Sequence, residues 1–214
     1  MTERRDLFRN VSAICGGGTN PAKFREIDLK TNGGFPHVEA EIHTGERARF
    51  YEDRIKNKVF LVNFMSIDDE QNFPVTANLA KTAQLLGDKV GREVFITSIT
   101  LNPEKDTVER LAEFASKHNA PSGWCFMRAT AEDAGTLLQR MYHFGKNIGP
   151  QLGRIVFYGN GQANVWGSFP GMIRPEDAAN RVTWVMPKEV PSTPRLAGPA
   201  RLGQNPYPWN NRAV

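Results

Sequence analysis

The chain has 214 residues, enough for one substantial α/β domain with extensions, because single domains commonly contain about 100–150 residues and sometimes more. Lysine and arginine outnumber aspartate and glutamate by only 27 to 23 and are spread along the chain. The strongly basic stripe of a nucleic-acid-binding protein is therefore missing. No apolar run approaches the roughly 18–20 residues that cross a bilayer, so we expect no transmembrane segment.

Residues 1–35 are polar and interrupted by glycine and proline, which predicts an extended N-terminal arm. Arg4 and Arg5 resemble the paired arginines of a twin-arginine export signal. The apolar segment of about 7–15 residues that such a signal needs is cut short at Gly16. Two interpretations stay open, a basic arm and an atypical export signal that is cleaved or retained. The second indicates a location in the periplasm or cell envelope.

Residues 36–186 carry the patterns of a folded domain. Two short alternating segments within 38–51 flank Thr44 and Gly45 and predict a β-hairpin. The continuous apolar run at 58–64 then predicts a central strand covered on both faces of its sheet.

Helical patterns alternate with strands after this run. Pro74 suits the first turn of a helix that Gly87 ends. A strand at 93–99 leads to a second helix, whose start we assign to a capping box formed by Asp106 and Glu109.

The remaining patterns predict, in order, a strand at 124–127, a helix at 131–142, strands at 154–158 and 163–167, and a helix from Pro175. Gly159, Asn160 and Gly161 tolerate positive φ and are assigned to the turn of the late hairpin. The order of elements gives two parallel crossovers, an antiparallel edge and a hairpin in front. This predicts an α/β chain with a thioredoxin-like fold, in which helices flank a central mixed sheet and extended arms lie at both ends.

The segment 187–214 has six prolines and four basic residues against one acidic residue, which cannot form a core. It is either a disordered tail or an extended strap laid along a protein partner. In the second case Tyr207 and Trp209 anchor the contact, with Arg201 as a charged neighbour.

A thioredoxin-like fold places its working corner between the central strand and the next helix, whose N–H groups stabilise a thiolate or another anion. Here residues 68–73 of that corner contain no cysteine, serine or histidine. Asp68, Asp69 and Glu70 are ligands for a hard cation, but carboxylates before a helix are favourable through the helix dipole alone. We prefer the second interpretation.

The soft ligands elsewhere indicate no metal site. Cys125 and Met127 share one face of a short strand, where core packing is preferred over a soft-metal site. Cys15 lies among glycines as a free thiol or a tether to a partner. The four histidines are scattered along the chain, at His37, His43, His118 and His143.

Three segments resemble the SCO/SenC family: HTGERARFYEDRIKNKVFLVNFM, the stretch from TANLAK to SGWCFM, and VFYGNGQANVWGSFPGM. The resemblance runs from about residue 36 to 186 and includes the link LNPEKDT. It implies a thioredoxin-fold copper chaperone of respiratory oxidase assembly.

The family's chemistry rests on a Cys-x-x-x-Cys-Pro corner and a histidine before the late hairpin. Matching these motifs places Asp69 and Phe73 at the cysteine positions and Leu152 at or near that of the histidine. All three ligands are therefore absent. We expect no catalytic residue and no bound metal or cofactor, with Phe73 filling the space of the second thiol.

The preferred function is a scaffold or accessory subunit of an envelope respiratory or electron-transfer complex, held by both arms. One alternative is a copper chaperone with non-standard ligands such as Asp69, Cys125 or a histidine. Another is a thiol-disulfide or peroxidase-type enzyme, although neither cysteine lies at the corner.

Overall fold

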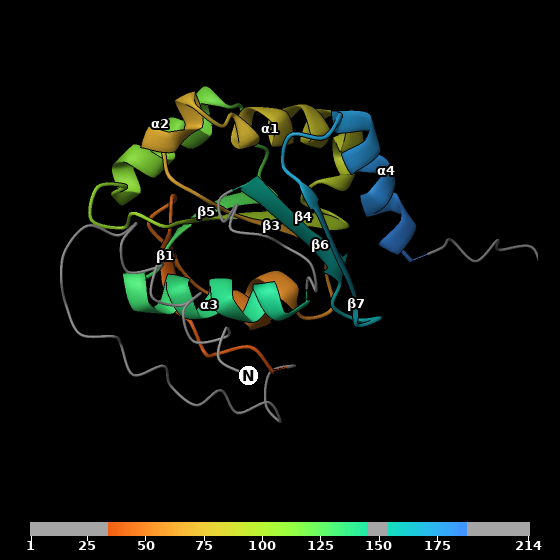
Figure 1. Cartoon of the computed structure of the whole chain (residues 1–214), viewed down its shortest axis with the longest axis horizontal. Helices are drawn as coiled ribbons and strands as arrows, with labels where there is room; N and C mark the ends of the chain where they lie inside the picture. The colour runs from red at the N-terminus through yellow and green to blue at the C-terminus, as the bar shows by residue number, and fades with distance from the viewer. Residues whose placement is uncertain (1–33, 145–153, 188–214) are drawn as a thin grey trace, which may run out of the picture.

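The computed structural model describes residues 34–144 and 154–187. The expectations for most of the N-terminal arm, for Leu152 and for most of the C-terminal tail lie outside these described residues. Within them, a seven-stranded mixed sheet lies between helices (Figure 1). The predicted thioredoxin-like arrangement of sheet and helices is confirmed.

The strands are β1 (Glu39–Ile42), β2 (Arg47–Arg49), β3 (Val59–Met65), β4 (Val94–Thr100), β5 (Trp124–Arg128), β6 (Ile155–Asn160) and β7 (Val165–Pro170). The helices are α1 (Val75–Leu86), α2 (Val108–Lys117), α3 (Ala131–Phe144) and α4 (Pro175–Val185), with short helical turns η3 (Phe50–Ile55), η4 (Asp68–Gln71) and η5 (Gly87–Lys89). None of the helices in the described part is long and apolar enough to cross a membrane.

The strand order is β2-β1-β5-β4-β3-β6-β7. Strands β3, β4 and β5 are parallel, as the two predicted crossovers require. Strand β6 runs antiparallel to β3, β7 antiparallel to β6, and the N-terminal hairpin joins the other side of the sheet through β1 and β5. Strand β3 therefore lies inside the sheet, between β4 and β6, and both of its faces are covered, which explains why all seven of its residues are buried.

Two apolar clusters cover the two faces of the sheet. One contains the buried residues of α3 together with Phe50 and Ile55 of η3. The other contains the buried residues of α1, α2 and α4. Figure 1 shows the same division, with α3 below the sheet and the other three helices above it. The corner after β3 lies at the edge of the second layer.

Three local predictions were wrong, two on hairpins and one on a helix start. The first hairpin ends at Arg49, and η3 replaces the expected end of its second strand. The late hairpin turns at 161–164, where Asn164 has φ 52°, whereas Gly159 lies inside β6. A Cβ at Gly159 would overlap the carbonyl oxygen of Val165, so close strand packing explains this glycine.

The capping box at α2 was also wrong. The N-cap is Thr107, whose hydroxyl oxygen accepts a hydrogen bond from the Arg110 backbone N–H at 3.4 Å. Asp106 instead points into the protein and is fully buried. Its partners belong to the corner described next.

Candidate functional site

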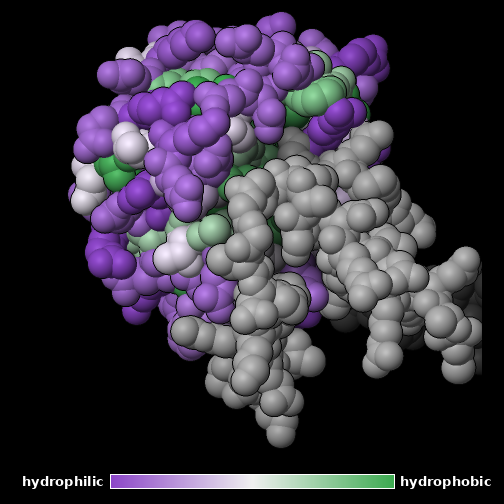
Figure 2. Space-filling model, turned by 60° about the vertical axis from the view of Figure 1, so that its left-hand side comes forward, coloured by the Kyte–Doolittle hydropathy of each residue, from purple (hydrophilic) through white to green (hydrophobic). Residues whose placement is uncertain are grey.

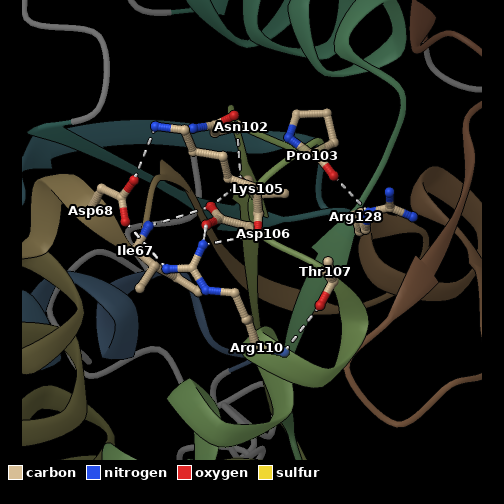
Figure 3. A network of polar contacts seen from close by, with 10 residues as sticks. Ile67, Asp68, Asn102, Pro103, Lys105, Asp106, Thr107, Arg110 and Arg128 are labelled. Carbon is tan, nitrogen blue, oxygen red and sulfur yellow. Dashed lines mark hydrogen bonds and ion pairs between the residues drawn. The ribbon is translucent and has the colours of Figure 1, made fainter.

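The candidate site is the corner formed by residues 66–74, between the end of β3 and the start of α1. The turn η4 forms most of it, through backbone hydrogen bonds such as Asp69 N–H to the Ser66 carbonyl at 3.2 Å. A polar network from the β4–α2 connection holds its first residues (Figure 3).

Asp106 holds the corner in place through hydrogen bonds of its buried carboxylate. Its Oδ2 accepts hydrogen bonds from the Thr100 hydroxyl at 2.5 Å and from the Ile67 backbone N–H at 3.3 Å. Its Oδ1 lies 3.5 Å from Nη1 of Arg110. One buried carboxylate therefore joins the end of β4, the start of α2 and the corner loop.

Asp68 is held by two basic side chains from the same connection. Its carboxylate lies 3.2 Å from Nη2 of Arg110 and 3.5 Å from Nζ of Lys105. The hydrogen bond from Arg110 is the main cause that lowers the pKa of Asp68. This carboxylate is therefore already neutralised within the chain, although the pair is exposed and weak.

Glu70 occupies the N-terminal end of α1. The N-cap residue Pro74 provides no side-chain hydrogen bond, and Oε1 of Glu70 accepts one from the Ala77 backbone N–H at 2.9 Å. Burial raises the pKa of Glu70, while the hydrogen bond from Ala77 opposes that rise. The helix end that stabilises an anion in this fold thus holds the chain's own carboxylate.

Phe73 lies beside Arg154, which comes just before β6. The central guanidinium carbon of Arg154 lies 3.3 Å from the centroid of the Phe73 ring, a cation–π contact. Phe73 remains 36% exposed. Together with Arg154 it covers the outside of the corner. That Phe73 fills the space of the family's second thiol stays a prediction.

Asp69 is exposed, and no hydrogen bond or ion pair of its side chain is found within residues 34–144 and 154–187. Its backbone carbonyl accepts hydrogen bonds from the N–H groups of Asn72 and Phe73, each at 3.0 Å. The structure thus brings the two expected cysteine positions, Asp69 and Phe73, to the same turn.

The donor set of the corner does not fit a soft metal such as copper(I), which selects thiolate, thioether and imidazole ligands. The side chains at 68–73 are carboxylates, amides and one phenyl ring. Across the described residues, no three histidine, cysteine, aspartate or glutamate side chains are grouped so that they could hold a metal ion.

Cys125 is a core residue, as preferred from the sequence. It is 3% exposed, and its thiol hydrogen-bonds the Thr97 hydroxyl at 3.6 Å. Burial raises the pKa of this thiol. Cys125 and Met127 pack on the α3 face, and Trp124 and Phe126 pack on the opposite face, as their alternation predicted.

His43 also has a structural contact, with the backbone of β5. Its Nδ1 accepts a hydrogen bond from the Phe126 backbone N–H at 3.2 Å. Burial and the charge of Arg54 lower its pKa. The neutral imidazole is therefore part of the contact between the N-terminal hairpin and β5.

Sequence analysis missed three residues that shape the corner, Asp106, Arg110 and Arg154. Asp106 was assigned only to a helix cap, and Arg110 was not singled out. Arg154 lies more than 75 positions from Phe73 along the chain. No local pattern in one sequence reports such contacts.

No family model and no curated protein matches the chain. Solved structures do match it. ScoI of Bradyrhizobium japonicum, solved with copper bound, is 14% identical, with a TM-score of 0.55, and the match covers 71% of this chain and 98% of ScoI.

A SCO1/SenC family lipoprotein of Bacillus anthracis is 17% identical, with a TM-score of 0.55, over 71% of this chain and 94% of the lipoprotein. BsSco, a member of the Sco family of cytochrome c oxidase assembly proteins, is 18% identical, with a TM-score of 0.54, over 69% of this chain and 90% of BsSco. This likeness shows that the chain has the fold of the SCO/SenC proteins.

Proposed function

We propose that this chain is a SCO-like protein that has lost copper and redox chemistry and acts as a scaffold or accessory subunit of an envelope complex. The fold agrees with that of proteins that bind copper or assemble cytochrome c oxidase. The sequence resemblance over residues 36–186 supports the same family. Respiratory or electron-transfer complexes of the cell envelope are therefore the proposed partners.

The observation that carries the proposal is that the corner is occupied by the chain's own contacts. Asp68 pairs with basic side chains, Glu70 binds the end of α1, and Phe73 lies against Arg154. Two thiolates and an imidazole are the donors that suit copper(I) and thiol exchange, and this corner has neither. A non-enzymatic role follows from the same argument.

Copper(I) titration of the purified full-length chain tests the loss of metal binding. We expect no stoichiometric binding by the unsubstituted chain. The triple variant Asp69→Cys, Phe73→Cys, Leu152→His restores the family's donors, and we expect it to bind about one copper ion per chain. Stoichiometric binding by the unsubstituted chain would contradict the proposal and favour a chaperone with non-standard ligands.

Co-purification from native membranes tests the scaffold role. We propose that the C-terminal tail contacts the partner through Arg201, Tyr207 and Trp209. The triple alanine variant at these positions should recover less of the complex than the unsubstituted chain. A double alanine variant at Asn210 and Asn211 changes neighbouring polar residues and should leave recovery unchanged. Equal recovery of both variants would show that these three tail residues do not contact the partner. Recovery of no complex at all would reject the scaffold role.

A further inference from the structure

Strand β7 forms one lateral edge of the sheet, because its sheet neighbour in the described part of the chain is β6 alone. Its sequence, VWGSFP, carries no charged residue. An edge strand presents a row of N–H and C=O groups that pair readily with another strand. Proteins usually guard such edges with charged side chains, prolines, very short strands or bulges. Of these devices β7 carries a proline, Pro170, at its last position.

The opposite edge is guarded in this way. Strand β2 has three residues, and two of them are arginines. Arg47 and Arg49 form ion pairs with Glu39 and Asp53. Figure 2 turns the β1 side of the molecule toward the viewer, and its surface outside the grey atoms is mostly hydrophilic. The two edges of one sheet therefore differ in chemistry.

Exposed apolar residues lie at or near the two ends of β7. Val165, at its first position, is 48% exposed, and Met172, just after its end, is 52% exposed. Trp184 of α4 is 73% exposed. The next residue, Val185, accepts a hydrogen bond through its carbonyl from the Asn160 side chain at 2.8 Å. Because Asn160 pairs with Val165 in the hairpin, the end of α4 lies near the first residue of β7.

We propose that β7 pairs antiparallel with β7 of a second copy of this chain. A two-fold axis at Gly167 would place the two glycines opposite each other and Val165 opposite Phe169 of the second copy. Val165 and Phe169 share a face by strand alternation, and Phe169 belongs to the cluster under α1. The exposed Val165 would thus extend an apolar face across the axis, with no charge repulsion along the edge.

Gly167 suits a position on this axis. A Cβ there would lie 2.7 Å from the ring of Tyr158, so the Tyr158 ring already lies over the backbone of β7. The ring therefore covers the sheet face next to the axis, where a side chain at position 167 would otherwise lie.

A strand from the chain's own C-terminal segment that pairs parallel with β7 is a poorer occupant. Strand β7 is parallel to β3, and α4 covers the same face as α1. The crossover β3–α1–β4 moves toward β5, whereas a strand following α4 and added parallel to β7 would lie in the other direction. That connection would be left-handed, a form found in only about 2% of crossovers.

The mass of the full-length chain in solution, measured by light scattering over a range of concentrations, tests the proposal. We expect the unsubstituted chain to approach twice its chain mass of 24.0 kDa as the concentration rises. Val165→Lys places a charge on the edge at a solvent-exposed site and should hold the chain at 24.0 kDa. Leu85→Lys makes the same change at a 54% exposed site of α1 and should dimerise like the unsubstituted chain.

Hydrogen exchange of the β7 amides gives a second measurement that needs no variant. Protection of β7 should increase with protein concentration in the unsubstituted chain. A monomer with strongly protected β7 amides would show that a segment of the same chain covers the edge, and a monomer with unprotected amides would show an open edge. Either result overturns the proposal, as does a dimer that persists in Val165→Lys. None of these results depends on copper binding, so they are independent of the proposed function.

Discussion

The buried carboxylate of Asp106 offers the sharpest test of how the corner is held. Asp106→Ala removes the acceptor of two hydrogen bonds, one from the Thr100 hydroxyl and one from the Ile67 backbone N–H. Thr100 and Asp106 are both 0% exposed, so water cannot replace the lost acceptor without entering the core. Asp106→Asn keeps one acceptor oxygen, removes the charge and replaces the oxygen that faces Arg110 with an NH2 group.

The expected loss follows from these contacts. Leaving a buried donor without an acceptor costs about 1–3 kcal/mol, so two donors give roughly 2–6 kcal/mol for Asp106→Ala. The ion pair with Arg110 adds little, because the Arg110 side chain is 41% exposed and water screens its charge. We expect a loss of about 3 kcal/mol for alanine and about 1 kcal/mol for asparagine.

Urea unfolding of the full-length chain measures this difference. With a slope of about 2 kcal/mol per molar urea, Asp106→Ala should lower the midpoint by about 1.5 M and Asp106→Asn by about 0.5 M. Glu104→Ala removes an exposed carboxylate two residues away and should leave the midpoint nearly unchanged. Equal, small shifts for Asp106→Ala and Glu104→Ala would show that the hydrogen bonds of Asp106 do not stabilise the fold.

Three further predictions concern the core. Ser98→Ala should lower the free energy of unfolding by about 2 kcal/mol in the same assay, because the buried indole N–H of Trp124 loses its acceptor at 2.9 Å. The lowered pKa of His43 favours the neutral imidazole in the folded state. The stability that this imidazole gives the fold is therefore complete above about pH 6.5 and decreases as the pH falls from there toward the lower folded-state pKa. Unfolding between about pH 7 and pH 5 should therefore show a smaller decrease in stability for His43→Gln than for the unsubstituted chain, and parallel curves would contradict this. In a Cys15→Ser background, the thiol of Cys125 should react with a thiol reagent only after denaturant is added, since burial raises its pKa, and fast labelling of the folded chain would refute its core position.

Most strands and helices were predictable because the spacing of their apolar residues identifies them locally. The apolar run at 58–64 predicted β3, and all residues of that strand are buried. Pro74 and Gly87 bracketed α1 closely, since one residue lacks an N–H and the other adopts φ 56° at the helix end. These signals act within a few residues, which is the range that a sequence pattern can report.

The errors arose where distant contacts override local preference. Asp106 has the spacing of a capping residue, but a hydroxyl six residues away and a backbone N–H 39 residues away determine its position. Gly159 is a residue typical of turns, but it lies within β6, where a glycine is needed because the neighbouring strand leaves no room for a side chain. The absence of thiols at the corner was readable in sequence, whereas the contact between Phe73 and Arg154 was not.

Glu70 at the head of α1 means that the helix end is electrostatically satisfied before any ligand arrives. An incoming anion or thiolate would have to displace a carboxylate that is tethered a few residues away and therefore present at very high local concentration. The chain itself supplies the counter-charge, so the Ala77 N–H has an acceptor whether or not a ligand is bound.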